Sequence, residues 1–123
     1  MTENEFKRRT KQAALRAIKV VEALRQSRTA DVLGKQLIRC ATSVGANYRA
    51  ACRARSTADM ISKLAIVEEE ADETLYWLEL IIESELLTET RLQGLMREFD
   101  EILAMIVASQ KTLRRNNPKN KAR

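Results

Sequence analysis

The residues best suited to metal or acid–base chemistry are the carboxylates between positions 68 and 73. Four glutamates and one aspartate lie in that run, but the chain has no histidine, the commonest general base and metal ligand. Neither a Glu-x-x-His metal pattern nor a Ser/His or Cys/His nucleophile can therefore be assembled. We predict no catalytic residue, no metal site and no cofactor. A metal-dependent nuclease built on Glu68 and Asp72 is the enzyme alternative, which EDTA would test.

A second group with chemical potential is a basic stripe on one predicted helix. Its four cations fall within about 80° of one another at 100° per residue, and arginine's planar fork matches phosphate oxygens. The C-terminal residues 111–123 add six Lys/Arg and no Asp/Glu. The predicted nucleic-acid contacts from both groups are Lys35, Arg39, Arg49, Arg53, Lys111, Arg114 and Arg115. The stripe could equally pair with acids of the next helix.

Those acids differ in their expected positions. Glu68, Asp72 and Glu79 lie beside the apolar stripe of their helix, where a basic partner could meet them across a helix interface. Glu69 and Glu73 are expected on a solvated face. These acids belong to a larger charge pattern along the chain. Residues 1–55 hold 13 Lys/Arg and 4 Asp/Glu, whereas residues 56–110 hold 3 Lys/Arg and 13 Asp/Glu. The net charge of +5 therefore hides a basic, acidic, basic order along the chain.

Apolar residues outside the expected core indicate self-association. Two helices each carry a second apolar face, where a monomeric bundle would place charged or polar side chains. Aromatic residues on such a face are typical of an interface centre. The predicted interface residues are Leu15, Ile18, Tyr76, Trp77 and Leu80.

The elements that must position these residues are helices. Three glycines and one proline are too few for the turns of a sandwich or barrel. Apolar periodicity predicts helices over residues 4–26, 30–54, 57–84 and 88–115, with inward-facing stripes that include Ile82 and Leu103. Ser27 or Thr29, Ser56 and Thr88 are the expected starts.

Short links between long helices force antiparallel neighbours. We therefore predict an all-α, antiparallel, up-down-up-down four-helix bundle over residues 1–115, followed by a flexible basic tail at 116–123. Cys40 and Cys52 lie about 18 Å apart along one helix and cannot bond to each other within a chain. No segment has the length and apolar character of a membrane span or a secretory signal, so the expected location is the cytoplasm.

Two sequence blocks resemble a known family. They are Ser-Val-Gly-Ala-Asn-Tyr-Arg at 43–49 and Asp-Glu-Thr-Leu-Tyr-Trp-Leu-Glu at 72–79. Both are similar to the four-helix bundle proteins of the 23S rRNA intervening sequence family, also called S23 proteins, and the similarity extends over roughly residues 10–113. The resemblance implies a small bacterial protein that forms a ring-shaped homopentamer and has no established enzymatic activity. A related bundle, an accessory factor of diversity-generating retroelements, binds nucleic acid.

The leading hypothesis is therefore a non-enzymatic homo-oligomer, a pentamer by the resemblance, that binds structured RNA or DNA through phosphate contacts. The alternative is a scaffold that recruits an unknown protein partner and has no direct role with nucleic acid. In that case the arginines would serve subunit pairing.

Overall fold

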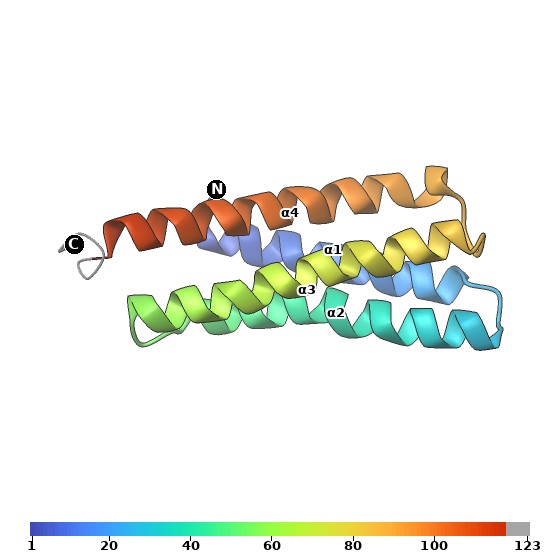
Figure 1. Ribbon diagram of the computed structural model, residues 1–123, viewed down its shortest axis with the longest axis horizontal. Coiled ribbons are helices and arrows are strands. Elements are labelled where there is room, and N and C mark those ends of the chain that lie inside the picture. The colour runs from blue at the N-terminus through green and yellow to red at the C-terminus, as the bar shows by residue number, and fades with distance from the viewer. Residues whose placement is uncertain (118–123) are drawn as a thin grey trace.

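Four long helices account for nearly all of residues 1–117, which are the residues that the computed structural model describes (Figure 1). No strand occurs in that range. The predicted all-α, four-helix fold is thereby confirmed. The predicted tail falls mostly on residues 118–123, outside the described residues. The helices are α1 (Glu3–Ala23), α2 (Arg28–Cys52), α3 (Thr57–Glu83) and α4 (Glu89–Asn116).

Each helix begins at a hydroxyl side chain that accepts a hydrogen bond from the backbone N–H three residues on. The caps are Thr2, Ser27, Ser56 and Thr88. Such a bond satisfies one of the N–H groups that the first turn leaves without a partner. Ser27, and not Thr29, caps α2, so that helix starts earlier than predicted. The first helix ends at Ala23, three residues short of the predicted end, because Leu24 is already extended.

Close approaches between α1 and α2 show that these helices run in opposite directions. A Cβ added at Gly45 would lie 3.1 Å from Thr10 Oγ1, and one added at Gly34 would lie 3.0 Å from Val21 Cγ1. Early residues of α1 thus face late residues of α2. Links of a few residues make each later helix return along the one before it (Figure 1).

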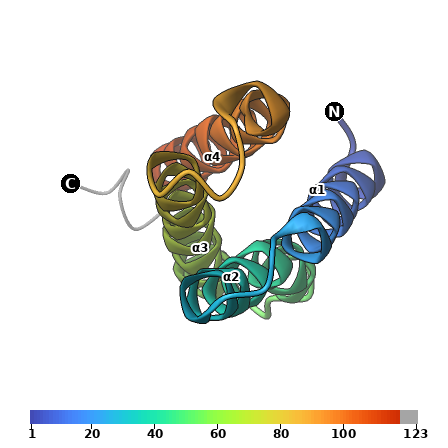
Figure 2. The ribbon, with the colours of Figure 1, turned by 90° about the vertical axis from the view of Figure 1, so that its right-hand side faces the viewer.

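The four helices surround one core, but the side between α1 and α4 is more open than the others (Figure 2). These two helices share far fewer contacts than the other neighbouring pairs. Arg9 bridges them: its Nε and Nη2 donate to the Glu98 carboxylate at 2.8 Å, and Nη2 also lies 2.9 Å from Glu101 Oε2. Hydrogen bonding from Arg9 lowers the pKa of Glu98.

The core is built mainly from the predicted stripes, with corrections on α3 and α4. Ile81 and Ile102 are fully buried, whereas the predicted Ile82 and Leu103 are only half-buried. Each pair is adjacent in sequence and differs by 100° around its helix, so at these two positions the core-facing residue is the one before the predicted residue. The largest buried side chains include Phe99, Leu37, Leu64 and Leu78.

Gly94 offers a test of how the exposed surface of α4 contributes to stability. It is exposed within the helix, and an added Cβ would meet only Arg16 Nη2 at 3.3 Å, the far end of a flexible side chain. Alanine loses less backbone entropy than glycine in a helix. We expect Gly94→Ala to raise the free energy of unfolding in urea by about 0.5–1 kcal/mol. Gly34→Ala, whose Cβ is crowded by Val21, is the matched control and should show a smaller gain or a loss.

Candidate functional site

Basic residues gather at one end of the bundle because neighbouring helices run in opposite directions. This end, called the basic end below, is where α1 and α3 begin and α2 and α4 finish (Figure 1). Two basic sequence blocks, far apart in the chain, therefore meet there. Its cations are Lys7, Arg8, Lys11, Arg49, Arg53, Arg55, Lys111, Arg114 and Arg115.

The acids at the basic end are engaged in local contacts. Glu3 pairs with Lys7 at 3.1 Å, and Asp59 pairs with Lys63 at 2.8 Å. Glu5 accepts a hydrogen bond from the Thr2 backbone in the capping box of α1. Arg8, Lys11, Arg49 and Arg53 have no carboxylate partner within residues 1–117. These four exposed cations leave the basic end with a positive field.

Three of the unpaired cations line a groove between α1 and α2, called the α1/α2 groove below. Its volume is about 430 Å³. Arg8 and Lys11 project from α1, and Arg49 projects from α2 on the facing wall. The full lining is Lys7, Arg8, Thr10, Lys11, Ala14, Thr42, Gly45, Ala46 and Arg49.

Hydroxyl groups in the groove are already used within their own helices. The Thr42 hydroxyl donates a hydrogen bond to the Ile38 carbonyl at 2.7 Å, and the Thr10 hydroxyl donates one to the Phe6 carbonyl at 3.1 Å. The remaining lining residues without charge are two alanines and a glycine. Charge on the rim, rather than hydroxyl donors on the floor, is therefore what the groove offers to a ligand.

Neighbouring phenol and thiol groups are held in their neutral forms. Tyr48 packs on Phe6 with ring centroids 4.5 Å apart and ties the start of α1 to the end of α2. Burial raises the pKa of Tyr48 and the pKa of Cys52. A raised pKa keeps the thiol protonated at neutral pH, and the thiolate is the nucleophilic form. The chemistry available here is binding of an anion by fixed positive charges.

The basic stripe predicted on α2 is divided by the structure. Arg49 and Arg53 are exposed at the basic end, but Lys35 and Arg39 lie on the other half of the helix. Arg39 is paired with acids of α3, at 2.7 Å to Glu73 and 3.5 Å to Glu70. The alternative prediction, pairing with the next helix, therefore holds for Arg39. The expectation that Glu73 is merely solvated was wrong, because it faces α2 across the helix pair.

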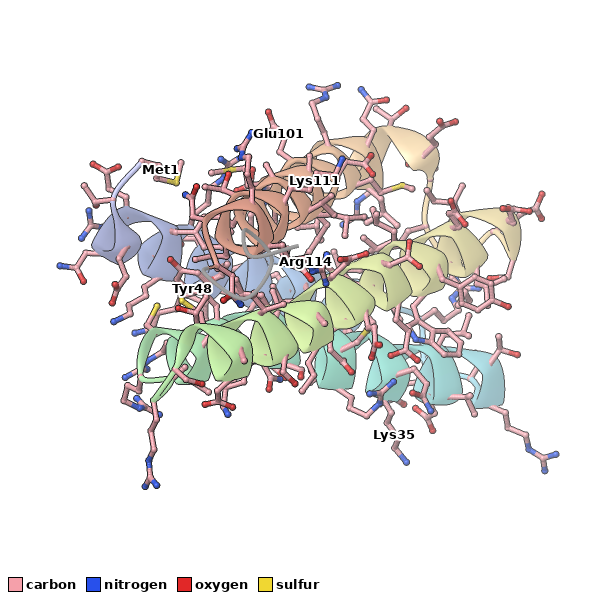
Figure 3. The ribbon with its side chains drawn as sticks, turned by 60° about the vertical axis from the view of Figure 1, so that its left-hand side comes forward. Met1, Lys35, Tyr48, Glu101, Lys111 and Arg114 are labelled. Carbon is pink, nitrogen blue, oxygen red and sulfur yellow. The ribbon has the colours of Figure 1, made fainter. Side chains whose placement is uncertain are left out.

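The three predicted cations of α4 share the basic end but not the groove. Figure 3 shows Lys111 on α4 and Lys35 below α2, on opposite sides of the bundle. Arg114 donates to Gln110 Oε1 at 3.3 Å, and Arg115 lies 3.5 Å from Thr112 Oγ1. A ligand that reaches both α2 and α4 has to extend across the end of the bundle.

Sequence reasoning missed Lys7, Arg8 and Lys11 as partners of Arg49. They are separated from it by more than 35 residues and become neighbours only because α1 and α2 run in opposite directions. The signal that could have found them is the excess of basic residues in the first turns of the first predicted helix. Matching those turns to the end of the next helix would have placed the groove.

The carboxylate run on α3 is dispersed around its helix. Glu68 accepts a hydrogen bond from the buried Gln110 at 2.6 Å, while Asp72 is exposed. Burial raises the pKa of Glu70, which pairs with Arg39. Within residues 1–117, no three His, Cys, Asp or Glu side chains are grouped so that they could hold a metal ion. The nuclease alternative thus gains no support from the geometry of these residues.

The predicted interface residues form two separate patches. Tyr76 is 52% exposed on α3, and Leu15 is 44% exposed on α1. Trp77 stacks edge-on against Tyr76 with centroids 5.2 Å apart, and it packs against the core together with Leu80. Ile18 is half-buried beside Leu15. Because α1 and α3 are not neighbours in the bundle, the two patches face different directions.

Comparisons with known proteins place this fold and these residues in context. A family model described as 23S rRNA-intervening sequence protein matches residues 2–108. A crystal structure of a protein with unknown function from the S23 ribosomal protein family of Bacteroides thetaiotaomicron is 36% identical, with a TM-score of 0.81. That alignment covers 86% of this chain and 98% of the other. No curated protein matches the chain. None of the helices in residues 1–117 is long and apolar enough to cross a membrane.

Proposed function

The chain belongs to the 23S rRNA-intervening sequence protein family, and from that premise we propose a non-enzymatic, homo-oligomeric bundle that binds structured RNA or DNA. The observation that carries the proposal is the concentration of exposed cations without carboxylate partners at the basic end, namely Arg8, Lys11, Arg49 and Arg53. Phosphate contacts supply most of the affinity in binding of this kind. Lys111, Arg114 and Arg115 extend the same charge onto α4.

Two separate apolar patches, on α1 and α3, support the proposed form of the assembly. Different patches on different sides of a subunit join head to tail and close into a ring when the rotation allows it. Tyr76 on one subunit and Leu15 on the next are the proposed centres of that contact. The ring is a homopentamer in this proposal. Repeating the basic end around a ring would multiply its contacts with one nucleic acid.

The test measures binding by fluorescence anisotropy at several salt concentrations, with protein that has been freed of nucleic acid. The probes are a labelled RNA hairpin and a duplex DNA. We expect micromolar or tighter affinity near physiological salt. With three or more phosphate contacts, the slope of log K against log salt should be about −3 or steeper. Absence of binding to both probes at low salt would contradict the proposal.

One observation favours the scaffold alternative. Arg39, a predicted phosphate contact, is instead engaged with Glu70 and Glu73 of its own chain. If the other arginines were similarly engaged between subunits, the protein would have little free charge for nucleic acid. Neither probe would then bind, and the search would move to protein partners.

A further inference from the structure

The α1/α2 groove has a definite length. Its lining runs from Lys7 to Ala14 on α1 and from Thr42 to Arg49 on α2. Seven residue steps along a helix cover about 10 Å. The groove is therefore a short channel at the basic end and does not extend along the whole bundle.

The dimensions of the groove decide which form of nucleic acid can enter it. The groove holds only about 430 Å³, whereas a DNA duplex has a major groove that alone is about 12 Å wide, so even a short piece of duplex is bulkier than the groove. A duplex can thus touch the rim from outside but cannot enter. The volume of about 430 Å³ falls in the range of small-molecule sites. It has room for a short piece of one strand.

The charges lie where the backbone of such a strand would pass. Arg8 and Lys11 form one wall and Arg49 the other, and none of the three has a carboxylate partner within the described chain. A strand lying between the walls would have its phosphates between cations of both helices. Lys7 is also on the rim, paired with Glu3.

The floor of the groove carries no side-chain hydrogen-bond donor that is free to read a base. Ala14, Gly45 and Ala46 have no polar side-chain atoms, and the Thr42 hydroxyl is bonded to its own helix. There is no aromatic side chain among the lining residues on which a base could stack. Binding in this groove would be tolerant of sequence.

We infer that the α1/α2 groove receives an unpaired stretch of an RNA or DNA strand, with its phosphates held between Arg8 and Lys11 on one wall and Arg49 on the other. The inference rests on the proposed function and narrows its ligand to unpaired segments. In a structured RNA these segments are the loops and ends, which are the parts that proteins commonly recognise.

The test separates the shape of the groove from its charge. Ala46 is an exposed lining residue, so Ala46→Met narrows the channel without changing any charge, and methionine is a good helix former. The probes are a labelled oligouridine too short to fold and a blunt RNA duplex with the same number of phosphates. Ala104→Met, at an exposed position of α4, is the matched control.

We expect Ala46→Met to weaken binding of the single strand about fivefold, to leave the duplex within about twofold, and Ala104→Met to change neither. Equal loss for both probes, or no loss for the single strand, would overturn the inference. Wild-type protein that binds only the duplex would overturn it while leaving the proposed function intact. Wild-type protein that binds neither probe would remove both. Thr42→Met, at another exposed lining residue of α2, repeats the test if Ala46→Met folds poorly by circular dichroism.

Discussion

Replacing Arg49 by glutamate should weaken nucleic-acid binding by about tenfold or more near physiological salt. The substitution removes one cation from the α1/α2 groove and places a negative charge beside Arg8 and Lys11. With one phosphate contact fewer, the salt slope should become shallower by about 1. Anisotropy titrations at several salt concentrations measure both quantities.

Arg97→Glu is the matched control for this change in charge. Arg97 is exposed on α4 away from the basic end, and its replacement alters the net charge by the same amount. If the two variants weaken binding equally, affinity follows total charge and not the basic end. Arg49 lies in the last turn of α2, so the reversal also costs up to about 1 kcal/mol against the helix dipole. This cost is small beside the stability of a domain, so thermal unfolding should show that Arg49→Glu and Arg97→Glu are both folded.

The mass of Arg49→Glu in solution distinguishes the two functional hypotheses. An intact oligomer with weaker nucleic-acid binding supports a role for Arg49 in contacting phosphate. Dissociation of the oligomer would instead place Arg49 in a subunit contact. The scaffold alternative would then lead, with Arg49 joining Arg39 among the arginines engaged by protein acids.

The helices were predictable from sequence because local signals specify them. The capping residues Ser56 and Thr88 and the apolar periodicity of each segment act over a few residues, so they can be read without knowing the fold. The core-facing arc was less predictable. Ile81 and Ile82 are equally apolar neighbours, and only packing against the other helices decides which one is buried.

The candidate site was predictable only in part, because it depends on pairing between helices. Arg49 was found from its position on one helix, but its groove partners belong to another. The choice of Arg39 between phosphate and a carboxylate depended on the register of α2 against α3, which places Glu73 within 2.7 Å of its guanidinium. Periodicity along a single helix contains no information on that register.

Among the proposed interface residues, Tyr76 is the one whose substitution should weaken the proposed ring assembly most. This side chain is 52% exposed on the outer face of α3. Truncating an aromatic hot-spot residue at the centre of an interface costs about 2 kcal/mol or more, which corresponds to about a 30-fold change in affinity. Burying the carboxylate of Tyr76→Glu in that contact adds a desolvation cost. We expect the variant to elute at the 14.0 kDa of one chain, whereas the wild type elutes at a multiple of it.

Tyr76 is a sharper choice for this test than its neighbour Trp77. The Trp77 ring packs against the core, and its indole nitrogen is buried without a hydrogen-bond partner in the described chain. A glutamate at Trp77 would therefore disturb the fold as well as any interface. A smaller oligomer mass could then not be assigned to one cause or the other. Ala104→Glu adds the same carboxylate to an exposed position on α4 and should keep the oligomer. Light scattering coupled to gel filtration measures the mass of the wild type, Tyr76→Glu and Ala104→Glu in solution. A Tyr76→Glu variant that keeps the wild-type mass would exclude this face of α3 from the subunit contact.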